Sequence, residues 1–190
     1  GMLGMHGARA SNLLVEECDL LMVVGARLGD RATGRLDSFC PKTGIVHIDI
    51  DACEVGKLRI PQVGITADAA DALNALLPLL HNNNHEPWLE RVAACKAEHG
   101  LRFDRLDEVC SPYGIISHVA EILDGKGIVA TDVGQHQMRV AQAYPMTQPR
   151  QWLTSGGLGT MGFGLPAAIG AALAKPEETV VCFSGDGSLL

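Results

Sequence analysis

Apolar residues in the first 80 positions form short runs that end at glycine or acidic residues. The run at Leu20–Val24 stops at Gly25, and further strand-like segments cover residues 45–51 and 63–65. Runs of this length are typical of parallel strands that are buried on both faces. Helical patterns at residues 12–18, 54–57 and 68–80 alternate with them, so this region predicts a doubly wound parallel α/β sheet.

A second alternation of helices and strands begins at Pro112. It predicts helices over residues 115–123 and 162–173 and strands over residues 127–131 and 179–183. The intervening segment starts with a polar, turn-rich stretch and continues with helical spacing, but it contains no strand pattern. We therefore predict an α/β domain over residues 1–80, a linker with a helix over 81–111, and the start of a second α/β domain over 112–190.

Composition narrows the class of protein. The chain has 15 basic and 22 acidic residues and a net charge of −7, with no basic cluster to hold a nucleic acid or an anionic membrane. No apolar stretch reaches the ~20 residues of a membrane span. The six cysteines show no C-x-x-C spacing, which predicts reduced thiols and a cytoplasmic location.

Both ends of the sequence are abrupt. Residues 1–7 have neither the charged nor the apolar region of a signal peptide. At the other end, a strand-like segment at residues 180–183 is followed only by a short turn, which would leave apolar residues and backbone donors unpaired. We therefore expect an internal fragment of a longer protein.

The richest motif lies at residues 154–171, where five glycines precede a helix of small residues. Glycines let a backbone approach a ligand closely, and a helix N-terminus offers free amide donors and a favourable dipole for an anion. The alternative interpretation is a tight structural turn that packs the helix closely. Glycine spacing alone does not decide between the two.

Two further segments follow predicted strands of the second domain. Residues 185–188 read Gly-Asp-Gly-Ser, and a strand-end carboxylate between glycines suits Mg²⁺ bound together with a diphosphate. Residues 131–138 combine a glycine with side chains that can bind a phosphate or a substrate, among them His136. An ordinary Asp-Gly turn and a polar surface loop are the competing interpretations.

The first domain has the form of a nucleotide site. Gly25 and Arg27 follow one strand, and Asp49 lies 24 positions after Gly25 at the end of the next. An arginine at position 27 or 31 can bind a diphosphate, and a strand-end acid can accept hydrogen bonds from ribose hydroxyls. The G-x-G-x-x-G fingerprint is absent, so this is not an ordinary dehydrogenase. A surface ion pair remains an alternative for Asp30 and Arg31.

Together these strings resemble the large catalytic subunit of the acetohydroxyacid synthase (acetolactate synthase) family, most of all its bacterial isozyme I branch. The resemblance covers nearly the whole chain, in the family's order and approximate spacing. It is carried by residues 4–7, 25–27, 47–51, 134–138 and 156–171.

The resemblance implies that residues 1–80 are most of a central FAD-binding domain and that residues 112–190 open a thiamine-diphosphate-binding domain, with one cofactor site in each. Residues expected to line FAD are Leu3, Gly4, Met5, His6, Gly25, Ala26, Arg27, Arg31, Asp49, Ile50, Asp68 and Ala69. Residues expected to bind thiamine diphosphate are Gln135, His136, Gly159, Met161, Gly187 and Ser188, with Asp186 as the Mg²⁺ ligand. The activating glutamate of the family and a downstream asparagine of the Mg²⁺ site are not found in these 190 residues, so we expect no turnover by the chain alone.

The resemblance also implies the activity. The family condenses two pyruvates, or pyruvate and 2-ketobutyrate, to 2-acetohydroxy acids with loss of CO₂, in branched-chain amino acid biosynthesis. The expected partners are these 2-ketoacids, further catalytic subunits in a homo-oligomer, and a small regulatory subunit. The alternatives left open are another thiamine-diphosphate enzyme, of the pyruvate oxidase or glyoxylate carboligase type, and a non-catalytic nucleotide-binding module.

Two positions depart from the family pattern. Gly29 stands where the family has an aspartate close to the expected flavin, and Arg139 replaces a tryptophan after Met138. The first change bears on flavin affinity and the second on packing near the substrate.

Overall fold

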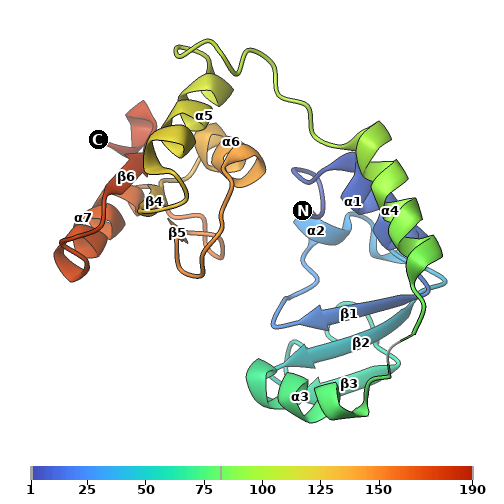
Figure 1. The fold of residues 1–190 in the computed structure, drawn as a ribbon. Coiled ribbons are helices and arrows are strands. Elements are labelled where there is room, and N and C mark those ends of the chain that lie inside the picture. The colour runs from blue at the N-terminus through green and yellow to red at the C-terminus, as the bar shows by residue number, and fades with distance from the viewer. Residues whose placement is uncertain (1, 82, 190) are drawn as a thin grey trace. The chain divides into compact units, whose positions relative to one another are not determined.

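A computed structural model describes residues 2–81 and 83–189. The chain divides after Leu101 into two compact units, which are described separately below. Each unit contains a small parallel sheet with its own helices (Figure 1). The predicted α/β class is confirmed.

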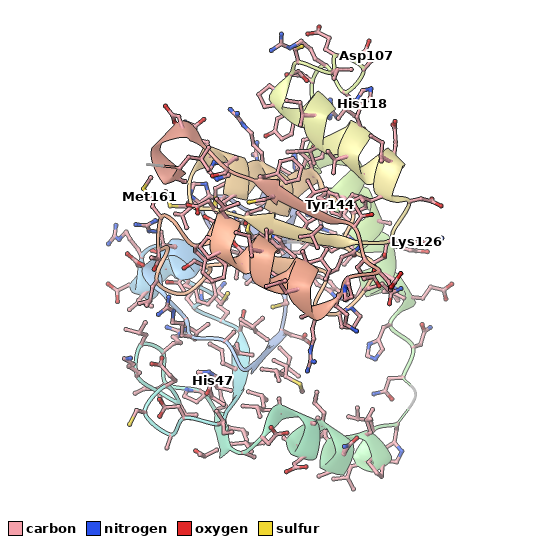
Figure 2. The ribbon with its side chains drawn as sticks, turned by 90° about the vertical axis from the view of Figure 1, so that its left-hand side faces the viewer. His47, Asp107, His118, Lys126, Tyr144 and Met161 are labelled. Atoms are coloured by element: carbon pink, nitrogen blue, oxygen red, sulfur yellow. The ribbon has the colours of Figure 1, made fainter. Side chains whose placement is uncertain are left out.

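The first unit contains strands β1 (Leu20–Val24), β2 (Gly44–Asp49) and β3 (Val63–Thr66), in the order β1-β2-β3. All pairs are parallel, so the three carboxyl ends lie at one edge of the sheet. Buried Val23, Phe39 and Ile45 belong to the core cluster of this unit. His47 is also buried in β2 (Figure 2), and neither of its ring nitrogens has a hydrogen-bond partner among the described residues.

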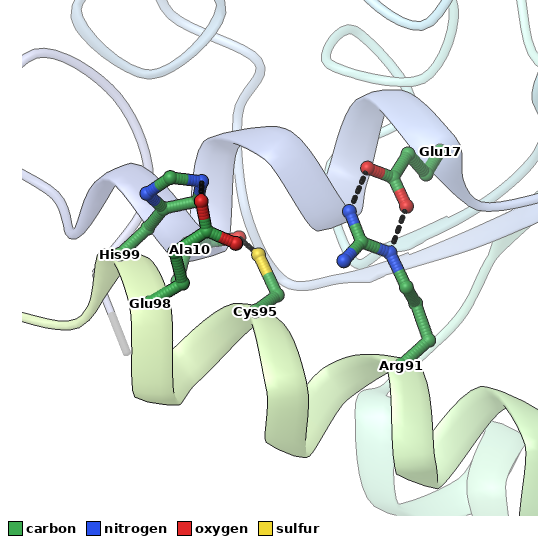
Figure 3. A network of polar contacts seen from close by, with 6 residues as sticks. All are labelled: Ala10, Glu17, Arg91, Cys95, Glu98 and His99. Atoms are coloured by element: carbon green, nitrogen blue, oxygen red, sulfur yellow. Dashed lines mark hydrogen bonds and ion pairs between the residues drawn. The ribbon is translucent and has the colours of Figure 1, made fainter.

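Two helices of the first unit pack against each other although they are far apart in sequence. Helix α4 (Glu86–His99) lies along α1 (Arg9–Glu17), and the Arg91 guanidinium donates to both oxygens of Glu17 at 2.7 and 2.5 Å (Figure 3). Cys95 is fully buried at the same contact, where its Sγ lies 3.8 Å from the carbonyl of Ala10. The helix expected in the linker therefore packs on the first unit.

The remaining elements of this unit are short. They are α2 (Asp30–Thr33), the 3₁₀ turn Leu36–Ser38, α3 (Ala69–Leu76) and the 3₁₀ turn Leu77–Leu79. The helix predicted at residues 54–57 is wrong, because this segment forms turns and Gly56 has a φ of 80°.

The second unit alternates regularly. It contains α5 (Pro112–Leu123), β4 (Ile128–Thr131), α6 (Gln135–Ala143), β5 (Trp152–Thr154), α7 (Gly164–Ala174), β6 (Val180–Phe183) and the 3₁₀ turn Asp186–Ser188. The strands are parallel in the order β5-β4-β6, so β4 is central. The sequence pattern missed α6 and β5, because α6 carries many polar residues and β5 has only three residues.

Strand β4 is covered by different helices on its two faces. Val129 packs in a cluster with Ile116 of α5 and Val140 of α6. Helix α7 contacts β4 and β6 and buries Ala168 and Ala171. Because side chains alternate along a strand, residues 130 and 132 point away from the cluster and toward α7.

The six cysteines, all within the described part of the chain, are free thiols. Among the described residues, no helix is long and apolar enough to cross a membrane.

Candidate cofactor site

Three segments of the second unit meet at the carboxyl ends of β4 and β6. They are the turn between β4 and α6, the glycine-rich loop that leads into α7, and the turn after β6. A Cβ atom at Gly185 would lie 3.4 Å from the ring of His136, and one at Gly187 would lie 3.4 Å from Cε of Met161. The structure therefore brings together residues predicted from three separate motifs to bind thiamine diphosphate.

Most of the predicted residues at this edge are exposed, whereas His136 and Ser188 are only partly so. Gln135 is exposed at the start of α6, and its Oε1 accepts a hydrogen bond of 3.2 Å from Arg139. His136 Nε2 is enclosed without a partner among the described residues. Gly159 has a φ of 67°, and the Met161 side chain is 57% exposed (Figure 2).

Asp186 lies at the start of the turn after β6, and its side chain is exposed. In the described part of the chain, no group of three or more His, Cys, Asp or Glu residues could hold a metal ion. A lone carboxylate still fits Mg²⁺, which commonly takes one or two carboxylates and completes its shell with water and phosphate oxygens. The donor set is thus suited to Mg²⁺ that arrives with a diphosphate.

Asp132 was not predicted as a site residue, yet its side chain connects two of these segments, the turn after β4 and the glycine-rich loop. It is fully buried, and its Oδ1 accepts from the amides of Val133 at 2.8 Å and Gly162 at 3.1 Å. Oδ2 accepts from the amide of Gly164 at 2.6 Å, and the nearby Ser188 hydroxyl also favours the charged carboxylate.

The environment of Asp132 favours its charged form. Burial raises the pKa of a carboxyl group, but here the hydrogen bonds from Gly164, Ser188, Val133 and Gly162 outweigh it and lower the pKa to about 2. In the sequence, only the glycine after β4 and the polar residues near it indicated a candidate binding segment here. The pairing with Gly164, 32 positions away, could not be found without the fold.

The Asp132 carboxylate shows that one prediction about the N-terminus of α7 was wrong. The sequence suggested that the N-terminus of α7 offers free amides to an anion, but Asp132 already accepts from Gly162 and Gly164 there. Helix α7 also begins at Gly164 and not at residue 162, where it was predicted to start. Because a fixed negative charge occupies the positive end of the helix dipole, a diphosphate is disfavoured at this point.

The glycine-rich loop itself leaves space for a ligand. A Cβ at Gly157 or Gly162 would meet no atom within 4 Å, and one at Gly156 would approach only a methyl group of Thr154. Gly164 is the opposite case, because its Cβ would lie 2.5 Å from the amide nitrogen of Asp132. The exposed backbone, the single carboxylate and the His136 nitrogen, which has no partner among the described residues, all fit thiamine diphosphate with Mg²⁺.

In the first unit, most of the predicted flavin residues follow the three parallel strands. Gly25, Ala26 and Arg27 follow β1, Asp49 and Ile50 end β2, and Asp68 and Ala69 follow β3. Gly25 donates to the carbonyl of Ile48 at 2.8 Å, and the amide of Ala67 donates to the carbonyl of Asp49 at 3.0 Å. These residues therefore share one edge of the sheet.

The other predicted flavin residues line a separate cavity. The amide of Met5 donates to the carbonyl of Arg31 at 3.0 Å, and Asn12 exchanges hydrogen bonds with both backbone groups of Gly4. Leu3, Gly4, Met5 and Arg31 line a cavity of about 280 Å³, whereas His6 is exposed beside it. This volume is below the ~300–1,000 Å³ of ordinary ligand sites, so it could hold only part of a dinucleotide.

A cavity of about 540 Å³ in the second unit lies elsewhere. It is lined by Phe103, Tyr113 and Pro145 among others, and by none of the predicted cofactor residues. The larger cavity therefore does not coincide with the predicted cofactor residues.

The structure accommodates both departures from the family pattern. Gly29 precedes α2 with a φ of −67°, and a Cβ there would meet no atom within 4 Å. The guanidinium of Arg139 lies 5.9 Å from the ring centre of Tyr113 while it donates to Gln135. Position 29 therefore has room for a side chain, and the Arg139 side chain makes its contacts inside the second unit.

Comparisons with known proteins identify the class of protein. Residues 1–76 match the family model described as thiamine pyrophosphate enzyme, central domain. Residues 132–190 match the thiamine pyrophosphate enzyme, C-terminal TPP binding domain. The chain belongs to the thiamine pyrophosphate enzymes.

Within this class, the whole chain is similar to acetolactate synthase large subunits. It is 54% identical over 190 residues to the isozyme 1 large subunit and 47% identical over 191 residues to the isozyme 2 large subunit, both of Escherichia coli K12. It is 46% identical over 195 residues to the chloroplastic acetolactate synthase 1 of Nicotiana tabacum. All of this chain is matched, and it spans 34%, 34% and 29% of these relatives.

Proposed function

We propose that this chain is the cofactor-binding centre of an acetolactate synthase catalytic subunit, which joins two 2-ketoacids with loss of CO₂. The observation that supports it most is the meeting of three predicted segments at the carboxyl ends of β4 and β6. There the ring of His136 lies beside Gly185, and Met161 lies beside Gly187. Thiamine diphosphate would supply the electron sink for decarboxylation, and the chain would hold and orient it.

The residues would divide the work by position. Asp186 would bind Mg²⁺, and Gln135, His136, Gly187 and Ser188 would lie at the diphosphate end. Gly159 would bring its backbone close to the aminopyrimidine, and the exposed thioether of Met161 would support the bend of the cofactor. The substrates, the homo-oligomer, the small regulatory subunit and the cytoplasmic location belong to the same proposal.

We further propose that the first unit binds FAD. The segments after β1, β2 and β3 would hold its adenosine and diphosphate parts, because Arg27 and Asp49 supply the charges that such groups need. The cavity beside Arg31 would take one end of the molecule. FAD titration, followed by flavin fluorescence, tests this part independently of turnover.

A segment exchange tests the main proposal. These 190 residues would replace the matching segment of the E. coli isozyme 1 large subunit, and acetolactate formation from pyruvate would be measured. We expect the grafted enzyme to be active and to lose at least 100-fold in activity with Asp186→Asn. Glu177→Gln, which changes an exposed acid before β6, serves as the control and should have no effect.

The outcome against the proposal is equally definite. A grafted enzyme that folds but binds no thiamine diphosphate in the presence of Mg²⁺ would contradict the assignment. Full activity of Asp186→Asn would contradict the metal role alone.

A further inference from the structure

The segments that carry the predicted thiamine diphosphate residues have few direct hydrogen bonds to one another. Among the described residues, the Met161 side chain approaches Gly187 at an exposed edge and not in a buried contact. Exposed loops with few buried contacts are mobile unless something fixes them. Correct placement of the cofactor therefore requires an anchor beneath the site.

The Asp132 carboxylate occupies that place. Its own backbone is fixed in the sheet, because its amide donates to the carbonyl of Phe183 in β6 at 2.9 Å. From there the side chain holds the first turn after β4 through Val133 and the start of α7 through Gly162 and Gly164. The same backbone bond to Phe183 links it to the end of β6, directly ahead of the Gly-Asp-Gly-Ser turn.

The close fit at Gly164 indicates that this arrangement is rigid. A Cβ at Gly164 would lie 2.9 Å from both Cα and Cβ of Asp132, so α7 begins directly against the aspartate. Charged hydrogen bonds are shorter and stronger than neutral ones, and this group is enclosed on every side. The carboxylate is therefore unavailable to a ligand and can act only through the groups it holds.

We propose that Asp132 is the positioning residue of the cofactor site: through its side chain and its backbone bond to β6, it ties the turn after β4, the glycine-rich loop and the strand end that leads into the Gly-Asp-Gly-Ser turn into one preformed cradle for thiamine diphosphate. This inference rests on the proposed function. Asp132 touches neither cofactor nor substrate, and it sets the distances among His136, Met161 and Asp186.

The test compares two buried anchors at opposite edges of the same sheet. Asp132→Asn keeps the shape of the side chain but turns one acceptor into a donor that faces backbone amides. The matched control is Gln151→Met. Gln151 is buried ahead of β5, where it accepts from Thr147 at 2.9 Å and donates to Gly125 at 3.3 Å, away from the cofactor segments.

Two measurements on the grafted enzyme separate positioning from general stability. Asp132→Asn should raise the dissociation constant for thiamine diphosphate at saturating Mg²⁺ at least tenfold, with less change in kcat at saturating cofactor. Without cofactor, it should also speed hydrogen exchange in residues 155–164 and 185–189. Gln151→Met should lower the thermal midpoint about as much as Asp132→Asn does. It should change neither the dissociation constant for thiamine diphosphate nor the hydrogen exchange of these segments.

Unchanged affinity and exchange in Asp132→Asn would overturn the inference, as would equal weakening by Gln151→Met. Should Asp132→Asn fail to fold, hydrogen exchange in the unsubstituted grafted enzyme tests the inference instead. The Gly164 amide should be protected from exchange before any cofactor is added, and protection that arises only on binding would refute a preformed cradle. If the unsubstituted graft binds no cofactor, the proposed function fails, whereas the exchange pattern still reports on the anchor.

Discussion

The two units place predicted ligand residues at the same edge of a parallel sheet, but they hold those residues differently. In the second unit, one buried carboxylate accepts from the turn after β4 and from the start of α7, and the same residue is bonded through its backbone to the end of β6. In the first unit, Asp49 and Asp68 each accept a hydrogen bond from their own loop. Asp49 accepts from Asp51 at 2.9 Å, and Asp68 accepts from Ala70 at 2.8 Å.

This difference affects how each site would bind. A preformed site spends little of its binding free energy on ordering loops, whereas independent loops must be ordered when the ligand arrives. We therefore expect thiamine diphosphate to change the exchange of its segments little and FAD to slow exchange at several loops of the first unit. The substitutions below test the contrast.

The largest effect is expected from Gly164→Ala. Its methyl group would lie 2.5 Å from the amide nitrogen of Asp132, so either α7 or the end of β4 must shift. Overpacking of this kind costs about 3 kcal/mol. The control is Gly170→Ala in the same helix, where a Cβ meets no atom within 4 Å and greater helix propensity should stabilise slightly. Thermal unfolding of both grafted variants measures the difference, and equal midpoints would contradict it.

The next effect concerns acid stability. Because the folded pKa of Asp132 is about 2 and its ordinary value is 3.8, its contribution to stability is complete above pH 3.8 and is lost as the pH falls through about 2. A shift of this size corresponds to ~2 kcal/mol. Asp132→Asn should remove that part of the pH dependence in acid unfolding followed by circular dichroism. Asp49→Asn in the first unit is the comparison, and a loss of the same size there would remove the contrast between the units.

A smaller and strictly local effect is expected at Asp68. This side chain caps α3 by accepting from Ala70 and Asp71, and loss of such a cap costs about 1 kcal/mol. Asp68→Ala should speed exchange in α3 but leave residues 25–27 and 3–6 unchanged. Asp68→Asn should restore the cap. Faster exchange at residues 25–27 would show that the loops of the first unit are coupled after all.

The sequence predicted the parts of this fold that depend on short-range pattern. The apolar runs of β1 and β6 and the glycines ahead of α7 are local signals, and they placed strands and loops correctly. The three-residue strand β5 has no such signal, because it is defined by pairing with β4 from Val129 to Thr131. Helix α6 was missed because its polar residues look like a loop when its buried face, at Gln137 and Val140, is unknown.

The candidate site was predictable only where motifs carry it. Asp186, Met161 and Gly159 stand in recognisable strings, and the structure brings their segments together. Asp132 gave no comparable signal, because an aspartate after a strand is expected at the surface. Its burial and its bond to Gly164 depend on how α7 packs on β4, which no local pattern specifies.

The smallest effect is expected from Gly29→Asp, which introduces the acid that the family pattern has at this position. Gly29 is the N-cap of α2, and its extended backbone and open surroundings allow an aspartate to cap the helix for a gain of about 0.3 kcal/mol. Because α2 carries Arg31, a better ordered helix should lower the FAD dissociation constant by less than about threefold, or about 0.6 kcal/mol. Gly29→Asn supplies the same cap without charge and separates the two causes. If Asp weakens FAD binding while Asn strengthens it, a negative charge at position 29 repels the flavin diphosphate, and the diphosphate lies beside α2 rather than at the ends of β1 and β2.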